Sequence, residues 1–294
     1  IMGGTHATAS REFLLPNAFN AKHTKMLKDA VNIPVFIGHN IFSPEDAEKM
    51  LAEGNADFVA LGRSQLAEPA WAKKAKEGRA SDIKPCINCL IGCIDRGMLS
   101  HTPIHCTVNP SLYRFECKPV EKAETRKQVA VVGAGPAGCE AALTASKRGH
   151  QVTIYEKRCI GGAMIEASKP ENKANIKRLI HYYEDHIMHD PNITLVKEEV
   201  EYETLVHSGY DAVIIAVGGK TRILNVPGIE KNSVIYASDY LNGSTAVTGN
   251  TVVVIGGGIT GAETALELNA EGKKVTIVEM TDAFLANFSS ACQA

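Results

Sequence analysis

An internal repeat constrains the fold of this 294-residue chain more than any other feature of its sequence. Shifting the sequence so that Gly133 falls on Gly256 brings a series of identical residues into register. The first copy contributes Gly133, Gly135, Gly138, Glu140, Leu143, Gly149, Val152, Thr153, Ile154 and Glu156, which match Gly256, Gly258, Gly261, Glu263, Leu266, Gly272, Val275, Thr276, Ile277 and Glu279. Identities of this kind indicate two copies of one structural unit.

Each copy has the pattern of a βαβ unit. An apolar run leads into a glycine-rich turn and a helix closed by a glycine, and a second β-branched run ends in glutamate. The three glycines of the turn allow the tight bend, the approach of a pyrophosphate, and close packing of helix and strand, while the glutamate accepts hydrogen bonds from ribose hydroxyls. The repeat therefore predicts two dinucleotide sites, made by Gly133, Gly135, Pro136, Ala137, Gly138 and Glu156 and by Gly256, Gly258, Ile259, Thr260, Gly261 and Glu279.

Four cysteines upstream of the repeat are spaced as metal ligands. They follow the pattern Cys86-x2-Cys89-x3-Cys93-x12-Cys106, and thiolates this close together favour a single 4Fe-4S cluster. Zinc is the alternative, although a zinc ribbon usually has two C-x-x-C pairs and the second pair is missing here. Two histidines between the last two cysteines are left open as replacement ligands, namely His101 and His105. The remaining cysteines are interpreted as ordinary thiols: Cys117, Cys139, Cys159 and Cys292.

The first 80 residues have the pattern of alternating strands and helices. Strands are predicted over residues 33–38 and 57–62, and between them Ser43 is a helix N-cap followed by Pro44, with Gly54 at the helix end. The two strands end in Gly38-His39 and Gly62-Arg63, which places small and cationic residues where barrel enzymes commonly bind phosphate. Because a whole (β/α)8 barrel needs about 250 residues, we expect this segment to be only its closing part.

Both dinucleotide turns resemble known flavoprotein reductases. The turn at Gly133, followed by Glu156 and by Gly161-Gly162, resembles the FAD half of reductases with two dinucleotide domains, and the turn at Gly256 resembles their NAD(P)H half. Residues 211–219 look like the strand that returns to the FAD domain before the nicotinamide domain is inserted. The resemblance implies that Gly162 lies near the flavin and that Gly218 belongs to the cofactor site.

The order of motifs along the chain resembles the multidomain branch of the old yellow enzyme family, which includes 2,4-dienoyl-CoA reductase, 2-enoate reductase and trimethylamine dehydrogenase. The motifs are the Gly62-Arg63 strand end, residues 66–69, the four-cysteine stretch over residues 84–110, and the two dinucleotide turns. Residues 84–110 are called the cysteine segment below. In that family the barrel holds FMN, which implies phosphate contacts from Gly38, Gly62 and Arg63. This chain departs from the family in having Gly38-His39 where many members have Gly-Arg, and x12 where x11 is also seen before the last cysteine.

The expected fold class is α/β, with four parts in sequence. We expect the C-terminal part of an FMN-binding (β/α)8 barrel over 1–80 and an iron–sulfur segment over 81–122. The first part of an FAD-binding domain is expected over 123–222 and the first part of an NAD(P)H-binding domain over 223–294. Both ends of the chain are interpreted as cuts through a longer protein.

The resemblance implies an NADH-dependent oxidoreductase that passes electrons from NADH to FAD, the 4Fe-4S cluster and FMN, and reduces an activated C=C bond of a small enoate or dienoyl-CoA type substrate. The catalytic acid and the substrate pocket would lie on earlier barrel strands, so the catalytic residues are unknown. Two alternatives stay open. One is an amine dehydrogenase of the trimethylamine dehydrogenase type, and the other is an electron-transfer module similar to the small subunit of glutamate synthase.

Composition and charge exclude several classes of partner. With 31 Lys+Arg against 33 Asp+Glu the net charge is −2, which disfavours nucleic acid and anionic membranes. No apolar run reaches the roughly 18 residues that a membrane span needs. The chain starts at Ile1 without a charged and apolar leader, so we expect a cytoplasmic protein with reduced thiols. Homo-oligomer formation is left open.

Glu279 predicts which nicotinamide cofactor is used. Its carboxylate ends the second strand of the second βαβ unit, where it can accept hydrogen bonds from both ribose hydroxyls of NADH. A 2′-phosphate at that place would be repelled, and the residues that follow, Met280-Thr281-Asp282, supply no cation. The sequence therefore predicts a preference for NADH over NADPH.

Overall fold

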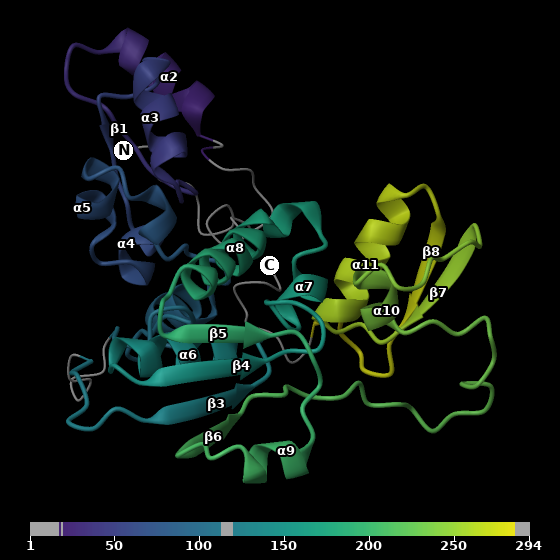
Figure 1. Cartoon of the computed structure of the whole chain (residues 1–294). Coiled ribbons are helices and arrows are strands. Elements are labelled where there is room, and N and C mark those ends of the chain that lie inside the picture. The colour runs from purple at the N-terminus through teal and green to yellow at the C-terminus, as the bar shows by residue number, and fades with distance from the viewer. Residues whose placement is uncertain (1–17, 19, 113–119, 286–294) are drawn as a thin grey trace.

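The computed structural model describes residues 18, 20–112 and 120–285. Within them the strands form three parallel sheets, one of four strands and two of two strands, with helices between successive strands (Figure 1). This arrangement confirms the expected α/β class with parallel sheets. No helix in the described part of the chain is long and apolar enough to cross a membrane.

The N-terminal module alternates short strands and helices. Its elements are α2 (Ala21–Ala30), β1 (Phe36–Ile37), α3 (Pro44–Ala52), β2 (Phe58–Val59), α4 (Arg63–Ala67), α5 (Trp71–Lys76) and η2 (Ala80–Asp82). As expected, Ser43 caps α3 by accepting a hydrogen bond from the Asp46 N–H at 3.1 Å, and Gly54 takes a left-handed conformation just past the end of α3. The strands expected over 33–38 and 57–62 each contain two paired residues, because β1 and β2 have only each other as partners among the described strands.

The central module contains the first copy of the repeat. It consists of β3 (Gln128–Val132), α6 (Pro136–Lys147), β4 (Gln151–Tyr155), α7 (Met164–Ala167), η4 (Glu171–Lys173), α8 (Ala174–Met188), β5 (Ile193–Val196), α9 (Tyr202–His207) and β6 (Ala212–Ile215). The sheet order is β5-β4-β3-β6, so the first strand of the repeat lies inside the sheet. Its core also includes Cys86 and Val108 from the cysteine segment, which therefore shares the hydrophobic core of this module.

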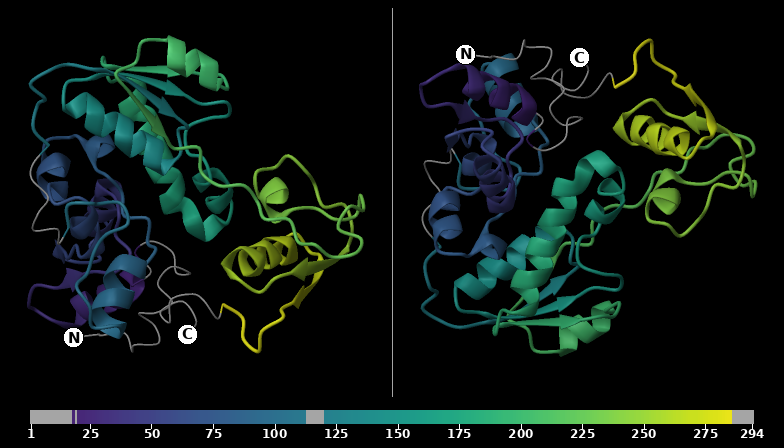
Figure 2. Two further views of the ribbon diagram at one scale, coloured as in Figure 1. Left: turned by 90° about the horizontal axis from the view of Figure 1, so that it is seen from below. Right: turned by 90° about the horizontal axis from the view of Figure 1, so that it is seen from above.

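The third module contains the second copy. It consists of α10 (Ala237–Leu241), β7 (Thr251–Ile255), α11 (Ile259–Ala270) and β8 (Lys274–Val278). The register is the same in both copies, since Gln128 pairs with Gln151 in the first and Thr251 with Lys274 in the second. In both views of Figure 2, α8 lies between the N-terminal module and the module of α11. It contacts η2 on one side, and α7 next to it contacts α10 on the other.

The third glycine of each turn lies against the backbone of the first. A Cβ on Gly138 would come 1.8 Å from the carbonyl oxygen of Gly133, and a Cβ on Gly261 would come 1.9 Å from that of Gly256. Both distances are far below any real contact, so only glycine fits. The close packing of helix on strand that the repeat predicts is present in both copies.

Substituting Gly138 by alanine should destabilise the central module by about 2–3 kcal/mol, because the added methyl group forces α6 away from β3. Gly219→Ala is the matched control, since a Cβ at Gly219 meets nothing within 4 Å and its φ is not positive, and a change within about 0.5 kcal/mol is expected. Urea unfolding followed by circular dichroism measures both. Equal unfolding midpoints for the two variants would contradict the packing argument.

Candidate cofactor-binding sites

The first dinucleotide turn is held in place by its own glutamate. Gly133 has a φ of +99° and donates its N–H to the carbonyl of Tyr155, the last residue of β4. Glu156 follows directly and its carboxylate accepts from the N–H of Ala134 at 2.8 Å and from the N–H of Arg158 at 2.7 Å. The acid that the sequence assigned to ribose therefore follows β4 directly and is hydrogen-bonded to the glycine turn.

The start of α6 and the Gly161-Gly162 turn meet at this mouth. Pro136 and Ala137 are exposed in the first turn of α6, whose N-cap residue Gly135 supplies no side-chain hydrogen bond to its N–H groups. The N–H of Gly161 donates to the carbonyl of Ala134 at 2.8 Å, and a Cβ on Gly162 would lie 2.8 Å from the Cα of Gly135. Two segments that the sequence linked only by resemblance thus form one surface.

Gly218 lies beyond the carboxyl end of β6. Two residues earlier, Ala216 donates its N–H to the carbonyl of Val132 at 2.8 Å. A Cβ on Gly133 would collide with the carbonyl oxygen of Ala216. Gly218 has a φ of +71° and is exposed, and no described atom lies within 4 Å of its Cβ position. It therefore lies at the same sheet edge as the first turn without contacting it.

The second turn repeats the geometry of the first. Glu279 accepts from the N–H of Gly257 at 2.6 Å, which is the equivalent of the Ala134 contact, and from the N–H and hydroxyl of Thr281 at 2.8 and 2.9 Å. These hydrogen bonds, that from Gly257 above all, lower the pKa of Glu279 below its usual value. At the start of α11, Ile259 is half-buried and Thr260 is exposed. The N-cap residue of α11 is Gly258, which supplies no side-chain hydrogen bond to the N–H groups of the first helical turn.

The four predicted metal ligands line one pocket. The thiols of Cys86, Cys89, Cys93 and Cys106 are free and line it together with Arg63 and His105. His105 was left open as a ligand, and His101 is not among the lining residues. Among the described residues, however, no three His, Cys, Asp or Glu side chains are grouped closely enough to hold one metal ion.

Burial and strained backbone distinguish the cysteine segment. Burial raises the pKa of Cys86 to about 12 and also raises that of Cys93, which lies on the π-helical segment η3 (Ile91–Leu99). On either side of Cys89, Asn88 and Leu90 have left-handed φ angles of 56° and 60°. Left-handed non-glycine residues and π-helical turns are both frequent at functional sites.

Arg63 joins the barrel-like strand ends to the cysteine pocket. Its guanidinium donates to the Asn40 side-chain oxygen at 2.9 Å and to that of Asn88, and it lies 5.6 Å from the centre of the Phe42 ring. Asn40, like Asn88, has a left-handed φ. The resemblance implied only a phosphate contact for Arg63. The structure places its side chain on the cysteine pocket as well, which sequence spacing does not reveal.

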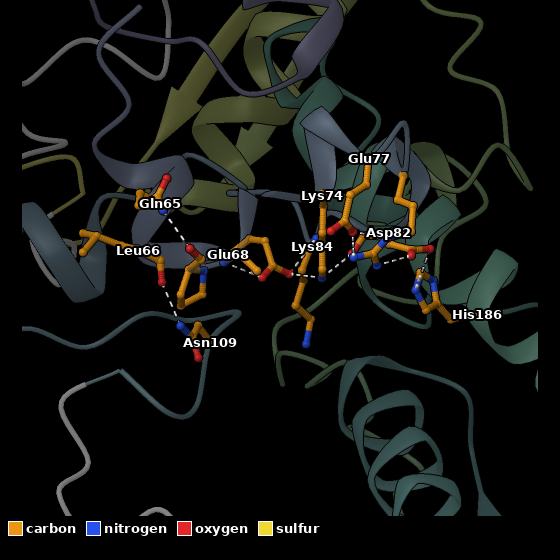
Figure 3. Close-up of polar contacts among 12 residues, drawn as sticks. Gln65, Leu66, Glu68, Lys74, Glu77, Asp82, Lys84, Asn109 and His186 are labelled. Carbon is orange, nitrogen blue, oxygen red and sulfur yellow. Dashed lines mark hydrogen bonds and ion pairs between the residues drawn. The ribbon is translucent and has the colours of Figure 1, made fainter. Parts of the chain in front are cut away.

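Both ends of the cysteine segment are attached to the end of α4, one to Leu66 within the helix and the other to Glu68 just after it (Figure 3). After Cys106, the Asn109 side chain donates to the Leu66 carbonyl at 2.9 Å. Before Cys86, the backbone N–H of Lys84 lies 3.5 Å from the Glu68 carboxylate, which also accepts from Lys74 at 2.6 Å. These contacts give a physical role to residues 66–69 and 106–110, which the sequence distinguished only by resemblance.

The two other cysteines that the structure describes, Cys139 and Cys159, are not among the residues that line the pocket. Cys139 is buried on α6 and contacts the Ala134 carbonyl, and Cys159 is exposed. Cys117 and Cys292, which were also interpreted as ordinary thiols, lie outside the described residues.

Comparisons with known proteins give the families that the two halves of this chain match. Residues 8–82 match the NADH:flavin oxidoreductase / NADH oxidase family, and residues 127–294 match the pyridine nucleotide-disulphide oxidoreductase family. The chain is 44% identical to an NADH oxidase of Thermoanaerobacter brockii over 86% of this chain and 40% of that protein. It is 33% identical to a cinnamate reductase of Clostridium sporogenes over 92% and 40%.

A solved structure of 2-naphthoyl-CoA reductase in complex with 2-naphthoyl-CoA has a TM-score of 0.89 and 30% identity, and the match covers 95% of this chain and 42% of that one. The chain thus spans about 40% of the length of these relatives. The two matched families follow one another in the order that the motifs predicted. The chain belongs to the multidomain old yellow enzyme family of flavin-dependent oxidoreductases.

Proposed function

We propose that the protein is an NADH-dependent reductase of activated C=C bonds that uses FAD, one 4Fe-4S cluster and FMN. The observation that carries the proposal is the pocket shared by Arg63 and the four cysteines. It lies between the strand ends of the N-terminal module and the core of the module with the first dinucleotide turn. The cysteine pocket would therefore adjoin both flavin sites.

The residues on either side of the cysteine pocket fit the two proposed flavins. In the central module, Gly133, Gly135, Gly138 and Glu156 would hold FAD, with Gly162 facing its flavin side. In the N-terminal module, Gly38 and Gly62 have φ angles outside the left-handed region. A Cβ would meet only ordinary contacts at Gly38 and none at Gly62. Since the described fold does not require glycine there, space for a phosphate beside Arg63 explains both residues.

The spacing of the cysteines along the chain supports a cluster over a zinc ion. A zinc ribbon usually has two C-x-x-C pairs, and the second pair is missing here. The four thiols line one pocket, where they would hold a 4Fe-4S cluster.

The cofactors would supply the redox chemistry, in which NADH delivers two electrons as a hydride, the cluster passes single electrons, and a flavin on each side converts between the two. The net reaction is alkene plus NADH plus a proton to alkane plus NAD⁺. This chain's residues would hold the cofactors in the order NADH, FAD, cluster and FMN. The catalytic acid and the substrate pocket would lie on barrel strands before β1.

The competing proposal is an amine dehydrogenase, in which electrons flow from the amine through the cofactors to an outside acceptor. The second dinucleotide turn argues against it, because Glu279 is aligned on Gly257 in the same way as Glu156 on Ala134. A turn retained in this form fits a site that binds NADH. An electron-transfer module similar to the small subunit of glutamate synthase would not need the Gly62-Arg63 strand end beside the cysteines.

Anaerobically purified protein should contain about four irons per chain, because four thiolates of one pocket bind one cluster. Replacing Cys89 by alanine should remove most of the iron, whereas Cys159→Ala, at an exposed thiol outside the pocket, should leave the iron content unchanged. Elemental analysis and visible absorbance measure this. One zinc per chain without iron would rule out the cluster.

With its cofactors bound, the enzyme should oxidise NADH when an alkene conjugated to a carboxylate, thioester or ketone is supplied, and the product should be the saturated compound. Mass spectrometry of the product checks this reaction. NADH oxidation independent of any alkene, together with reduction of an artificial acceptor by amines, would favour the amine dehydrogenase alternative.

The kcat/KM ratio should favour NADH over NADPH, and Glu279→Ala should reduce this preference by about tenfold, because the carboxylate repels a 2′-phosphate. Since its hydrogen bonds lower the pKa of Glu279, the carboxylate is ionised throughout about pH 6 to 8 and the preference should not change over that range. Glu156→Ala is the matched control in the first copy and should leave the ratio unaltered. Wild-type enzyme that prefers NADPH would show that Glu279 does not select the cofactor.

A further inference from the structure

The repeat contains a second pair of matched acids that the cofactor sites do not use. Glu140 and Glu263 occupy equivalent positions, two residues after the last glycine of each turn. Glu140 forms an ion pair with Lys84, and Glu263 forms one with Lys173 at 2.6 Å. Each dinucleotide helix is thus joined by its glutamate to a lysine from an earlier part of the chain.

The lysine of the first pair is largely buried. The Lys84 side chain is only 13% exposed, and its ammonium lies 5.7 Å from the ring centres of both Tyr182 and Tyr183. The Tyr183 hydroxyl donates to the same Glu140 carboxylate at 2.7 Å. Burial and the neighbouring Glu140 raise the pKa values of both tyrosines, so Tyr183 remains a donor at any physiological pH.

The ion pair of Lys84 with Glu140 lies close in sequence to both the cysteines and the first glycine turn. Lys84 lies two residues before Cys86, and Glu140 lies two residues after Gly138. The path from a cluster ligand to the FAD turn therefore runs through Pro85, one ion pair and Cys139. Figure 3 shows the backbone of Lys84 beside Glu68 while its side chain points away from Glu68. One residue thus links α4–α5, the cysteine segment and α6.

We propose that Glu140 and Lys84 are positioning residues that fix the cysteine segment on the FAD-binding helix and thereby set the separation between the cluster and FAD. The proposal rests on the proposed cofactors for its kinetic consequence only. The docking itself concerns residues of this chain. Because the Lys84 side chain is largely buried while Glu140 is about one-third exposed, removing the Glu140 charge leaves the Lys84 ammonium buried without its charged partner, and removing the Lys84 charge removes the attachment to α6.

The test uses the enzyme purified anaerobically with its cofactors and the variants Lys84→Met, Glu140→Gln and Lys84→Arg. Backbone hydrogen exchange over residues 84–90 should become at least about tenfold faster in the first two variants and return towards wild type in Lys84→Arg, which keeps the charge. After rapid mixing with NADH, FAD reduction should stay within about twofold of wild type. The following electron transfer to the cluster should slow by about fivefold or more in Lys84→Met and Glu140→Gln.

Two matched controls separate docking from a general loss of structure. Glu263→Gln breaks the equivalent pair in the second copy, and Lys157→Met breaks the exposed pair with Glu199. Both should leave exchange over residues 84–90 unchanged. Unchanged exchange in Glu140→Gln and Lys84→Met, or an equal slowing of both electron-transfer steps, would overturn the proposal. Protein without iron would contradict the proposed function, while hydrogen exchange would still decide whether the pair docks the segment.

Discussion

The contact between the Gly138 Cα and the Gly133 carbonyl determines much of the structure around the first site. It brings α6 so close to β3 that the start of the helix and the end of the strand form one tight turn. The same turn presents the Ala134 N–H to Glu156 and the Ala134 carbonyl to Gly161. Any side chain at position 138 would separate these groups. The absence of a side chain there therefore allows β3, α6, Glu156 and the Gly161-Gly162 turn to pack together.

The same constraint is used twice in different surroundings. In the first copy the turn lies in a four-stranded sheet whose strand β3 is buried, with Ala130 and Val131 fully inaccessible. In the second copy the described sheet has two strands, and Val253 and Ile255 are more than half exposed. The glutamate nevertheless accepts from the equivalent N–H in both copies. Turn geometry is therefore set locally, by glycines and one carboxylate, while stability depends on how many strands flank the unit.

Features that depend on local sequence could be predicted, whereas long-range side-chain contacts could not. The glycine spacing located both βαβ units, and Ser43 located the start of α3, because each signal acts within a few residues. Cysteine spacing gave a ligand set that shares a pocket. The contacts of Arg63 with Asn88 and of Lys84 with Glu140 join residues 25 and 56 positions apart, and nothing in either segment alone indicates its partner. The short strands β1 and β2 were overestimated because apolar patterning reports burial and not the number of paired neighbours.

The cysteine segment illustrates why these long-range contacts are needed. Its described residues form no separate hydrophobic core, since Cys86 and Val108 are buried in the core of the central module. Its backbone also includes left-handed residues at Asn88 and Leu90, each of which costs on the order of 1–2 kcal/mol. A segment with little core and strained backbone keeps one conformation only if its neighbours hold it. Three contacts attach the segment to its neighbours. Asn88 accepts from Arg63 at the strand end, Asn109 donates to the end of α4, and Lys84 pairs with Glu140 of α6. The conformation of the cysteine pocket therefore depends on how the segment packs against the N-terminal and central modules, and a change at any of the three attachments should alter it without touching a cysteine.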